Sequence, residues 1–221
     1  MLAERNRRRD DRPMKILAVC IGAAEILPGK KYRTGINKHV VGGAVMIDAE
    51  GLIGDAICNR KHHGGCDQAV YVEGSLTLDW WSHELGRRLE PGSFGENIVI
   101  EGLDNCDVSV GDRFIAGDLV LEVTSARIPC ATFAAKMGDP KFVKRYFQAR
   151  RPGIYCRVIE VETVAAGAAV THIPYAGARV TMPEMIATHG QRLSPQDRAR
   201  YLSAPIHHKL RAMLESEAVG S

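Results

Sequence analysis

Cys130 is the residue of this sequence that is best placed to do chemistry. It follows an alternating run, 119–124, in which apolar residues recur at every second position, as is typical of a half-buried strand. Pro129 has no backbone donor and cannot continue a central strand, so we expect Cys130 just past the strand end. Arg127 lies nearby and would favour the thiolate, which is both the nucleophile and the metal ligand. Because a free cysteine is more often an inert small hydrophobic residue, this stretch alone leaves the function open.

Two further stretches combine glycines with polar side chains. Residues 61–71 read KHHGGCDQAVY, and residues 92–97 read GSFGEN. Neighbouring glycines let the backbone approach a ligand and turn its N–H groups toward it. The alternative for either stretch alone is a tight turn with local caps, which is the usual role of such residues.

The cysteines give little support for a metal site or a disulfide framework. The chain has 6 of them, scattered and without a Cys-x-x-Cys pair. Without a signal sequence, this spacing argues against both a disulfide framework and a zinc ribbon. The sequence comes nearest to a metal cluster at His62, His63 and Cys66. Adjacent histidines on a strand point apart, so these residues would chelate poorly and we expect no zinc site there.

The composition of the 221 residues limits the class of protein. Lys and Arg total 29 against 26 Asp and Glu, a balance that argues against nucleic-acid binding. The arginine-rich residues 1–13 are expected to form a disordered tail. No apolar run reaches the roughly 18 residues of a membrane helix, and none resembles a signal peptide. A cytoplasmic protein is therefore expected, with its oligomeric state left open.

Short strands separated by turns account for most of the chain. The patterns predict helices at 75–85, 132–136 and 141–148. Many short strands with few helices predict a mainly β protein, either a barrel or a sandwich. No Gly-x-Gly-x-x-Gly follows a strand, which argues against a nucleotide-binding doubly wound sheet. The predicted strands are 15–21, 44–47, 52–57, 69–72, 97–100, 113–116, 119–123, 154–161 and 168–173.

The C-terminal part of the chain changes in character. Thr181 and Ser194 have the positions of helix caps, and Pro205 separates the second helix from a third. Three helices could form a nucleic-acid-binding motif, but residues 181–221 carry 5 Lys and Arg against 4 Asp and Glu, a weak charge for phosphate binding. We therefore expect residues 14–178 to form a β-barrel domain and residues 179–221 a small helical appendage.

In their order along the chain, these motifs resemble those of the MOSC domain family. The matching stretches are HGGCDQAVY, GSFGEN, VGDRF, the segment from Glu122 to Cys130, and GIYCRV. The helical tail resembles that of the YiiM-like branch, so the likeness extends over residues 15–217. The resemblance implies a MOSC β-barrel-like domain with short peripheral helices.

The resemblance also implies a cofactor, a reaction and a site. The cofactor would be a pyranopterin molybdenum cofactor, with the Cys130 thiolate as metal ligand and catalytic residue, since a soft thiolate suits such a metal. The reaction would be the reduction of a small N-hydroxylated compound, such as a hydroxylaminopurine, to its amine with electrons from a partner reductase. The residues expected to bind the cofactor supply cations, backbone donors, carboxylates and amides. They are Lys61, His63, Gly64, Gly65, Asp67, Gln68, Phe94, Gly95, Glu96, Asn97, Arg127 and Arg151.

Two alternatives to the reductase stay open. A persulfide carrier for cofactor assembly would need the same reactive thiol at Cys130. A non-catalytic pterin-binding module would bind the cofactor without turnover. The chain also departs from the family pattern, with Cys66 where proline is common and Ser125-Ala126 where Gln-Pro often precedes the arginine. These departures concern the pocket rim and the choice of substrate more than the cofactor site.

Overall fold

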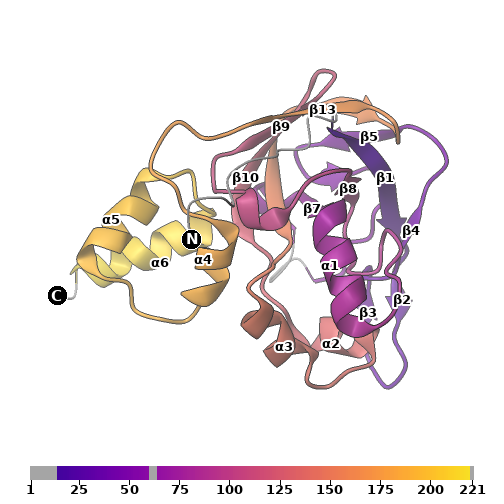
Figure 1. Ribbon diagram of the computed structural model, residues 1–221, viewed down its shortest axis with the longest axis horizontal. Coiled ribbons are helices and arrows are strands. Elements are labelled where there is room, and N and C mark those ends of the chain that lie inside the picture. The colour runs from indigo at the N-terminus through magenta and orange to yellow at the C-terminus, as the bar shows by residue number, and fades with distance from the viewer. Residues whose placement is uncertain (1–13, 60–63, 220–221) are drawn as a thin grey trace, which may run out of the picture.

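The computed structural model describes residues 14–59 and 64–219, and a closed β-barrel lies at its centre (Figure 1). The barrel strands are β1 (Met14–Gly22), β7 (Val70–Gly74), β8 (Ile98–Ile100), β9 (Arg113–Ala116), β10 (Leu119–Ala126), β11 (Ile154–Glu160) and β13 (Ala169–Ile173). Their order is β13-β9-β10-β11-β7-β8-β1, and β1 closes the barrel by pairing with β13. Neighbouring barrel strands run antiparallel except β7 and β8, which run parallel. The predicted mainly β barrel is confirmed.

The remaining strands form additions at the rim of the barrel. They are β4 (Lys38–Val40), which pairs with the end of β1, the sheet of β12 (Glu162–Val164), β5 (Val45–Asp48) and β6 (Gly51–Leu52), and the hairpin of β2 (Glu25–Ile26) and β3 (Arg33–Thr34). The predicted strand at 52–57 is therefore much shorter than expected. After Leu52 the chain turns at Gly54, whose φ of 92° favours glycine, and the following residues leave the sheet.

The helices lie outside the barrel, in two groups (Figure 1). The first group is α1 (Ser75–Leu85), α2 (Ala131–Met137) and α3 (Phe142–Ala149), and the second is α4 (Met182–Ala187), α5 (Pro195–Ser203) and α6 (His208–Val219). Two 3-10 turns, η1 (Cys66–Gln68) and η2 (Asn105–Asp107), connect strands. The predicted caps are confirmed, since the Thr181 and Ser194 hydroxyls accept from backbone N–H groups at 3.3 and 3.0 Å. None of the helices in the described ranges is both long and apolar enough to cross a membrane.

The alternation of side chains along the strands builds two hydrophobic cores. On β1, Val19 faces the barrel core, whereas Ala18 and Cys20 face a second core under α1, α2 and α3. The barrel core also takes in Met185 and Leu214 from the C-terminal helices. Those helices therefore complete the core of the barrel and do not form one of their own.

Aromatic side chains dominate the second core. Trp81 of α1 stacks on Tyr146 of α3 with ring centroids 5.4 Å apart, and Phe133 of α2 meets Phe142 edge to face at 4.9 Å. Trp81 and Phe133 are fully buried. Aromatic pairs of this kind stabilise a fold beyond the area that they bury. The cluster fixes α2 against the barrel, and α2 begins directly after Cys130.

Candidate functional site

The chain leaves the barrel at the residues that the sequence singled out. The Arg127 N–H donates to the Gly153 carbonyl at 2.9 Å, so pairing with the neighbouring strand continues one residue beyond β10. Cys130 then takes an extended conformation as the residue that precedes α2. The predicted position of Cys130 just past a strand end is confirmed.

Cys130 lines a pocket between the barrel end and the loops that follow β3 and β6. Its enclosed volume is about 140 Å³. Lys61 and His63 lie outside the described residues, within the segment that leads into Gly64. Of the predicted site residues, the pocket brings together Gly64, Gln68, Gly95, Asn97, Arg127 and Cys130.

Arg127 is a buried cation beside this pocket. The residue is only 4% exposed, and its guanidinium carbon lies 3.6 Å from the centroid of the Phe133 ring and 5.3 Å from that of Tyr71. Among the described residues, no group accepts a hydrogen bond from Nε or Nη1. Burying a charged group with open donors is unfavourable. Beside the pocket there is therefore a fixed positive charge with two nitrogens that lack an acceptor in the described part of the chain, which suits an anionic ligand.

A buried ion pair between Lys38 and Asp55 forms another part of the pocket wall. Asp55 also accepts from the Asn97 amide at 2.9 Å and from the Gly22 N–H at 2.8 Å. Burial lowers the pKa of Lys38, and the charge of Asp55 opposes this shift. The sequence analysis missed both partners, because Lys38 in β4 and Asp55 in the loop after β6 come together only in the tertiary structure.

Three predicted site residues have structural partners away from the pocket. Phe94 is fully buried in the aromatic core. The Glu96 carboxylate accepts from the N–H groups of Gly92 and Phe94 at 2.6 and 2.9 Å, and burial raises its pKa. Arg151 pairs with Asp104 at 2.9 Å. Glu96 holds the turn that presents Gly95 to the pocket, so its part in the site is indirect.

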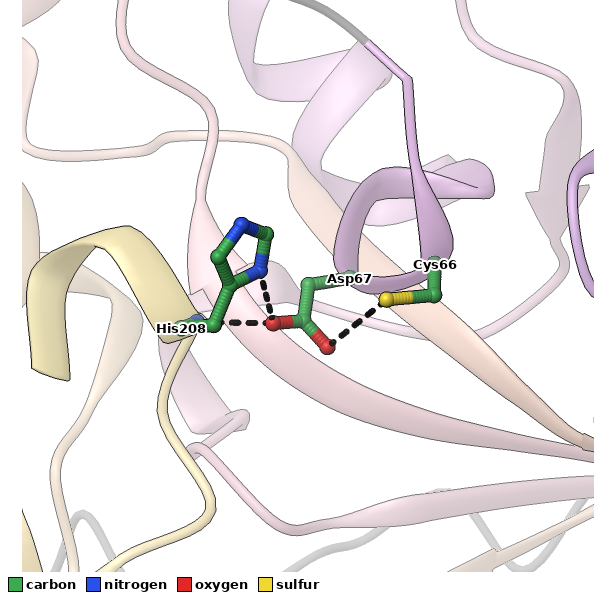
Figure 2. A group of neighbouring side chains, drawn as sticks. All are labelled: Cys66, Asp67 and His208. Carbon is green, nitrogen blue, oxygen red and sulfur yellow. Dashed lines mark hydrogen bonds and ion pairs between the residues drawn. The ribbon is translucent and has the colours of Figure 1, made fainter. Parts of the chain in front are cut away.

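Asp67 points toward the C-terminal helices (Figure 2). Its Oδ2 accepts from the backbone N–H of His208 and lies 2.7 Å from His208 Nδ1, while Arg157 approaches Oδ1 at 2.9 Å. Burial acts to raise the pKa of Asp67, but the contacts with His208 and Arg157 outweigh it, so the pKa lies below its usual value. Gly65 lies just before η1 and is not among the residues that line the pocket. Asp67 and Gln68 are therefore neighbours in η1 that point in different directions, since Gln68 lines the Cys130 pocket.

A buried carboxyl group lies behind the pocket wall. The Tyr71 hydroxyl donates to Oε1 of Glu73 at 2.6 Å, and the Asn105 amide donates to Oε2 at 2.5 Å. Burial, and then the charge of Glu96, raise the pKa of Glu73 to about 8. A pKa of about 8 favours the protonated form of Glu73 at neutral pH. No local pattern in the sequence distinguished this glutamate from a solvated strand residue.

Comparison with known proteins connects this geometry to one family. A sequence model of the MOSC domain matches residues 59–171. The chain is 36% identical over 155 residues to the uncharacterized protein YflK of Bacillus subtilis, covering 69% of this chain and 70% of YflK. It is 33% identical over 100 residues to YiiM of Escherichia coli, 44% of this chain and 45% of that protein.

This chain is also similar to a protein named Reductase and to a solved crystal structure. A Gibberella moniliformis protein named Reductase is 28% identical over 143 residues, which is 63% of this chain but only 25% of that protein. The crystal structure of YiiM from Geobacillus stearothermophilus superposes with a TM-score of 0.76 at 24% identity, covering 92% of this chain and 98% of that one. At this identity the superposition shows a shared fold.

Proposed function

Because this chain belongs to the MOSC domain family, with a YiiM-like fold, we propose that it binds a molybdenum cofactor at Cys130 and reduces N-hydroxylated compounds to amines. MOSC domains are generally associated with this cofactor, and one relative carries the name Reductase. The observation that carries the proposal is the buried Arg127 guanidinium, which lines the same pocket as Cys130 and has two nitrogens without an acceptor among the described residues.

The pocket residues fit the proposed cofactor in charge and in ligand chemistry. A thiolate at Cys130 is the soft ligand that a sulfur-bound metal prefers. Arg127 can compensate the charge of the pterin phosphate, and its donors would then be satisfied. A Cβ at Gly95 would lie 2.8 Å from Ile36, so the backbone here passes close to the pocket wall. The volume of 140 Å³ is below the roughly 300 Å³ of small-molecule sites, so the pocket encloses one part of such a ligand.

The proposed reaction breaks the N–O bond of a hydroxylamine. Two electrons and two protons convert R–NHOH to R–NH₂ and water, and a reductase protein would supply the electrons. The bound cofactor would supply the two-electron chemistry. The chain itself would hold the metal through Cys130, orient the anionic part of the ligand through Arg127, and exclude water with the tyrosine rings of the pocket wall.

Elemental analysis of protein made in a cofactor-competent host tests the assignment. We expect stoichiometric molybdenum in the wild-type chain and its loss in Cys130→Ser, because a serine hydroxyl is a harder ligand that stays protonated. Cys106→Ser is the matched control, since Cys106 lies near Arg150 and outside the pocket, and we expect it to keep the metal. Full molybdenum content in Cys130→Ser would refute the role of this residue.

The same preparations separate the reductase from its alternatives. Loaded protein should convert a hydroxylaminopurine to the aminopurine when a chemical reductant replaces the partner protein. Cyanide-labile sulfur without molybdenum would instead identify a persulfide carrier. Bound molybdenum without amine formation from any N-hydroxylated compound would identify a non-catalytic binding module.

A further inference from the structure

A second group of potential metal ligands lies where the barrel meets the C-terminal helices (Figure 2). Cys66 and Asp67 belong to η1, and His208 begins α6, 141 residues after Asp67. The thiol sulfur, a carboxylate oxygen and Nδ1 of the histidine all lie within 4.8 Å of one another. The docking of α6 on the barrel brings these donors together. The sequence had paired Cys66 with His62 and His63, which lie outside the described residues.

The orientation of the donors distinguishes a metal site from a catalytic triad. His208 turns Nδ1 toward the carboxylate at 2.7 Å, and Cys66 Sγ lies 4.0 Å from the other carboxylate oxygen. Figure 2 shows the second ring nitrogen of His208 directed away from the thiol. A thiol–histidine–acid relay needs the thiol on that second nitrogen. Here Nδ1 of His208 and the Cys66 sulfur lie on either side of the Asp67 carboxylate, within 4.8 Å of each other (Figure 2).

We propose that Cys66, Asp67 and His208 bind a zinc ion. Thiolate, carboxylate and imidazole are the ligands that zinc takes in proteins, and three protein ligands leave a fourth position for water. Zinc bonds of about 2.0–2.3 Å in a tetrahedron separate the ligand atoms by roughly 3.3–3.8 Å. The three donor atoms lie within 4.8 Å of one another, so zinc binding would draw them closer together. Zinc binding requires a Cys66 thiolate, whose proton is released to solvent, and the neutral tautomer of His208 that carries its proton on Nε2 and leaves the Nδ1 lone pair for the metal.

Arg157 shares the carboxylate with the proposed ion. Its Nη2 lies 2.9 Å from Oδ1 of Asp67. A carboxylate offers about four lone-pair sites, so Asp67 can keep this contact and still bind a metal. The cation makes the site less favourable for zinc, whereas the negative charges of Asp67 and of a Cys66 thiolate favour it.

A zinc ion here would stabilise one wall of the Cys130 pocket without lying in that pocket. It would link the start of α6 to η1, whose last residue, Gln68, lines the Cys130 pocket together with Ala69. The site shares no ligand with that pocket and does not depend on the proposed cofactor. Its effect would be to stabilise the contact between the barrel and the C-terminal helices.

Zinc titration of the full chain, stripped with a chelator, tests the proposal. With a chromophoric competitor, we expect one zinc ion per chain and a rise in the melting temperature on zinc addition. Cobalt in place of zinc should give a thiolate-to-metal charge-transfer band. Cys66→Ser, at an exposed position, should keep the fold, abolish that band and weaken zinc binding at least about tenfold.

Matched variants identify the ligands. His208→Ala should weaken zinc binding as Cys66→Ser does, whereas Cys106→Ser and His189→Ala, which change the same residue types elsewhere, should leave it unchanged. Unchanged zinc affinity in Cys66→Ser, or the absence of stoichiometric binding in the wild-type chain, would overturn the proposal. Loss of zinc in Cys130→Ser with retention in Cys66→Ser would instead locate the ion in the other pocket.

Discussion

At the scale of single residues, Arg127 is the most informative position. The fold keeps a charged guanidinium 4% exposed against two aromatic rings, and none of the described residues accepts from Nε or Nη1. The contacts with Phe133 and Tyr71 recover part of the desolvation energy, since cation–π contacts contribute about 0.5–2 kcal/mol. A buried guanidinium with unpaired nitrogens is unfavourable without a ligand, so it indicates a role for Arg127 in binding one.

Substitution of Arg127 should separate stability from binding. We expect Arg127→Met to leave the cofactor-free chain at least as stable as the wild type. Methionine has a side chain of similar length and removes an uncompensated buried charge. Cofactor affinity should fall about ten- to a hundredfold, the value of one charge-assisted hydrogen bond of roughly 1.5–3 kcal/mol. Arg127→Lys keeps the positive charge but loses the paired N–H donors of the guanidinium, so its cofactor affinity should be intermediate. Urea unfolding and molybdenum content measure the two effects. Equal molybdenum content in wild type and Arg127→Met would show that the anion site lies elsewhere.

Glu73 should make stability depend on pH. Its pKa of about 8 lies above the ordinary 4.5, so between these pH values the folded state holds a proton that the unfolded state has released. Stability from this group is therefore lost as pH rises through that window, by at most roughly 1.4 kcal/mol per pH unit. Glu73→Gln mimics the protonated form, so the variant should gain stability relative to the wild type as pH increases.

Denaturant unfolding of both proteins across this window measures the difference. Glu101→Gln is the control, because Glu101 is an exposed partner of Lys15 and its loss should leave the pH dependence as in the wild type. A constant difference between wild type and Glu73→Gln at every pH would mean that Glu73 is ionised in the folded chain.

At the scale of elements, α2 connects the aromatic core to the pocket. Phe133 packs against Phe94 and Phe142 on one side and under the Arg127 guanidinium on the other. The helix starts directly after Cys130. Its position is therefore set by buried rings, and any displacement of α2 moves the thiol and the cation together.

Two leucine substitutions test this connection. Phe133→Leu and Phe142→Leu each remove a fully buried ring and should lower the free energy of unfolding by roughly 1–3 kcal/mol. Of the two phenylalanines, Phe133 is the one that contacts Arg127, so we expect its substitution, but not that of Phe142, to lower molybdenum content as well. Unfolding curves and elemental analysis of the two variants give the comparison. Equal molybdenum loss in both would attribute the effect to general destabilisation of the core.

At the scale of the whole molecule, the barrel and the C-terminal helices share one core. Met185, Tyr201 and Leu214 are buried with the barrel side chains, and His208 is held by Asp67. The sequence analysis treats residues 179–221 as an appendage, a division that stays a prediction. The shared core leads us to expect that this segment does not unfold independently.

Leu214→Ala in α6 tests this coupling. Both tryptophans of the chain, Trp80 and Trp81, lie in α1, so their fluorescence reports unfolding on the barrel side and not in the C-terminal helices. Loss of this buried leucine should cost about 2–5 kcal/mol. We expect tryptophan fluorescence and far-ultraviolet circular dichroism to show the same lowered urea midpoint. Met213→Ala, at an exposed neighbour, should change neither signal. An unchanged fluorescence midpoint in Leu214→Ala would show that the tail unfolds on its own.

Local patterns in the sequence determined the elements. Alternating apolar residues marked most barrel strands, and capping residues such as Thr181 and Ser194 marked helix starts, because these signals act between residues a few positions apart. The same locality placed Cys130 at a strand end. The motifs in their order along the chain resembled those of the MOSC family, and the comparisons confirm this membership.

Only the tertiary structure decided which polar side chains share a pocket. Gln68 and Asp67 are adjacent in the sequence, yet one lines the Cys130 pocket and the other faces His208. Arg151, which is predicted to bind the cofactor, pairs with Asp104, 47 residues earlier in the chain. Such partners are separated by tens of residues, and their distances depend on how strands register and helices dock. Short-range periodicity carries no information about those contacts, because it reports the face of an element and not what that face meets.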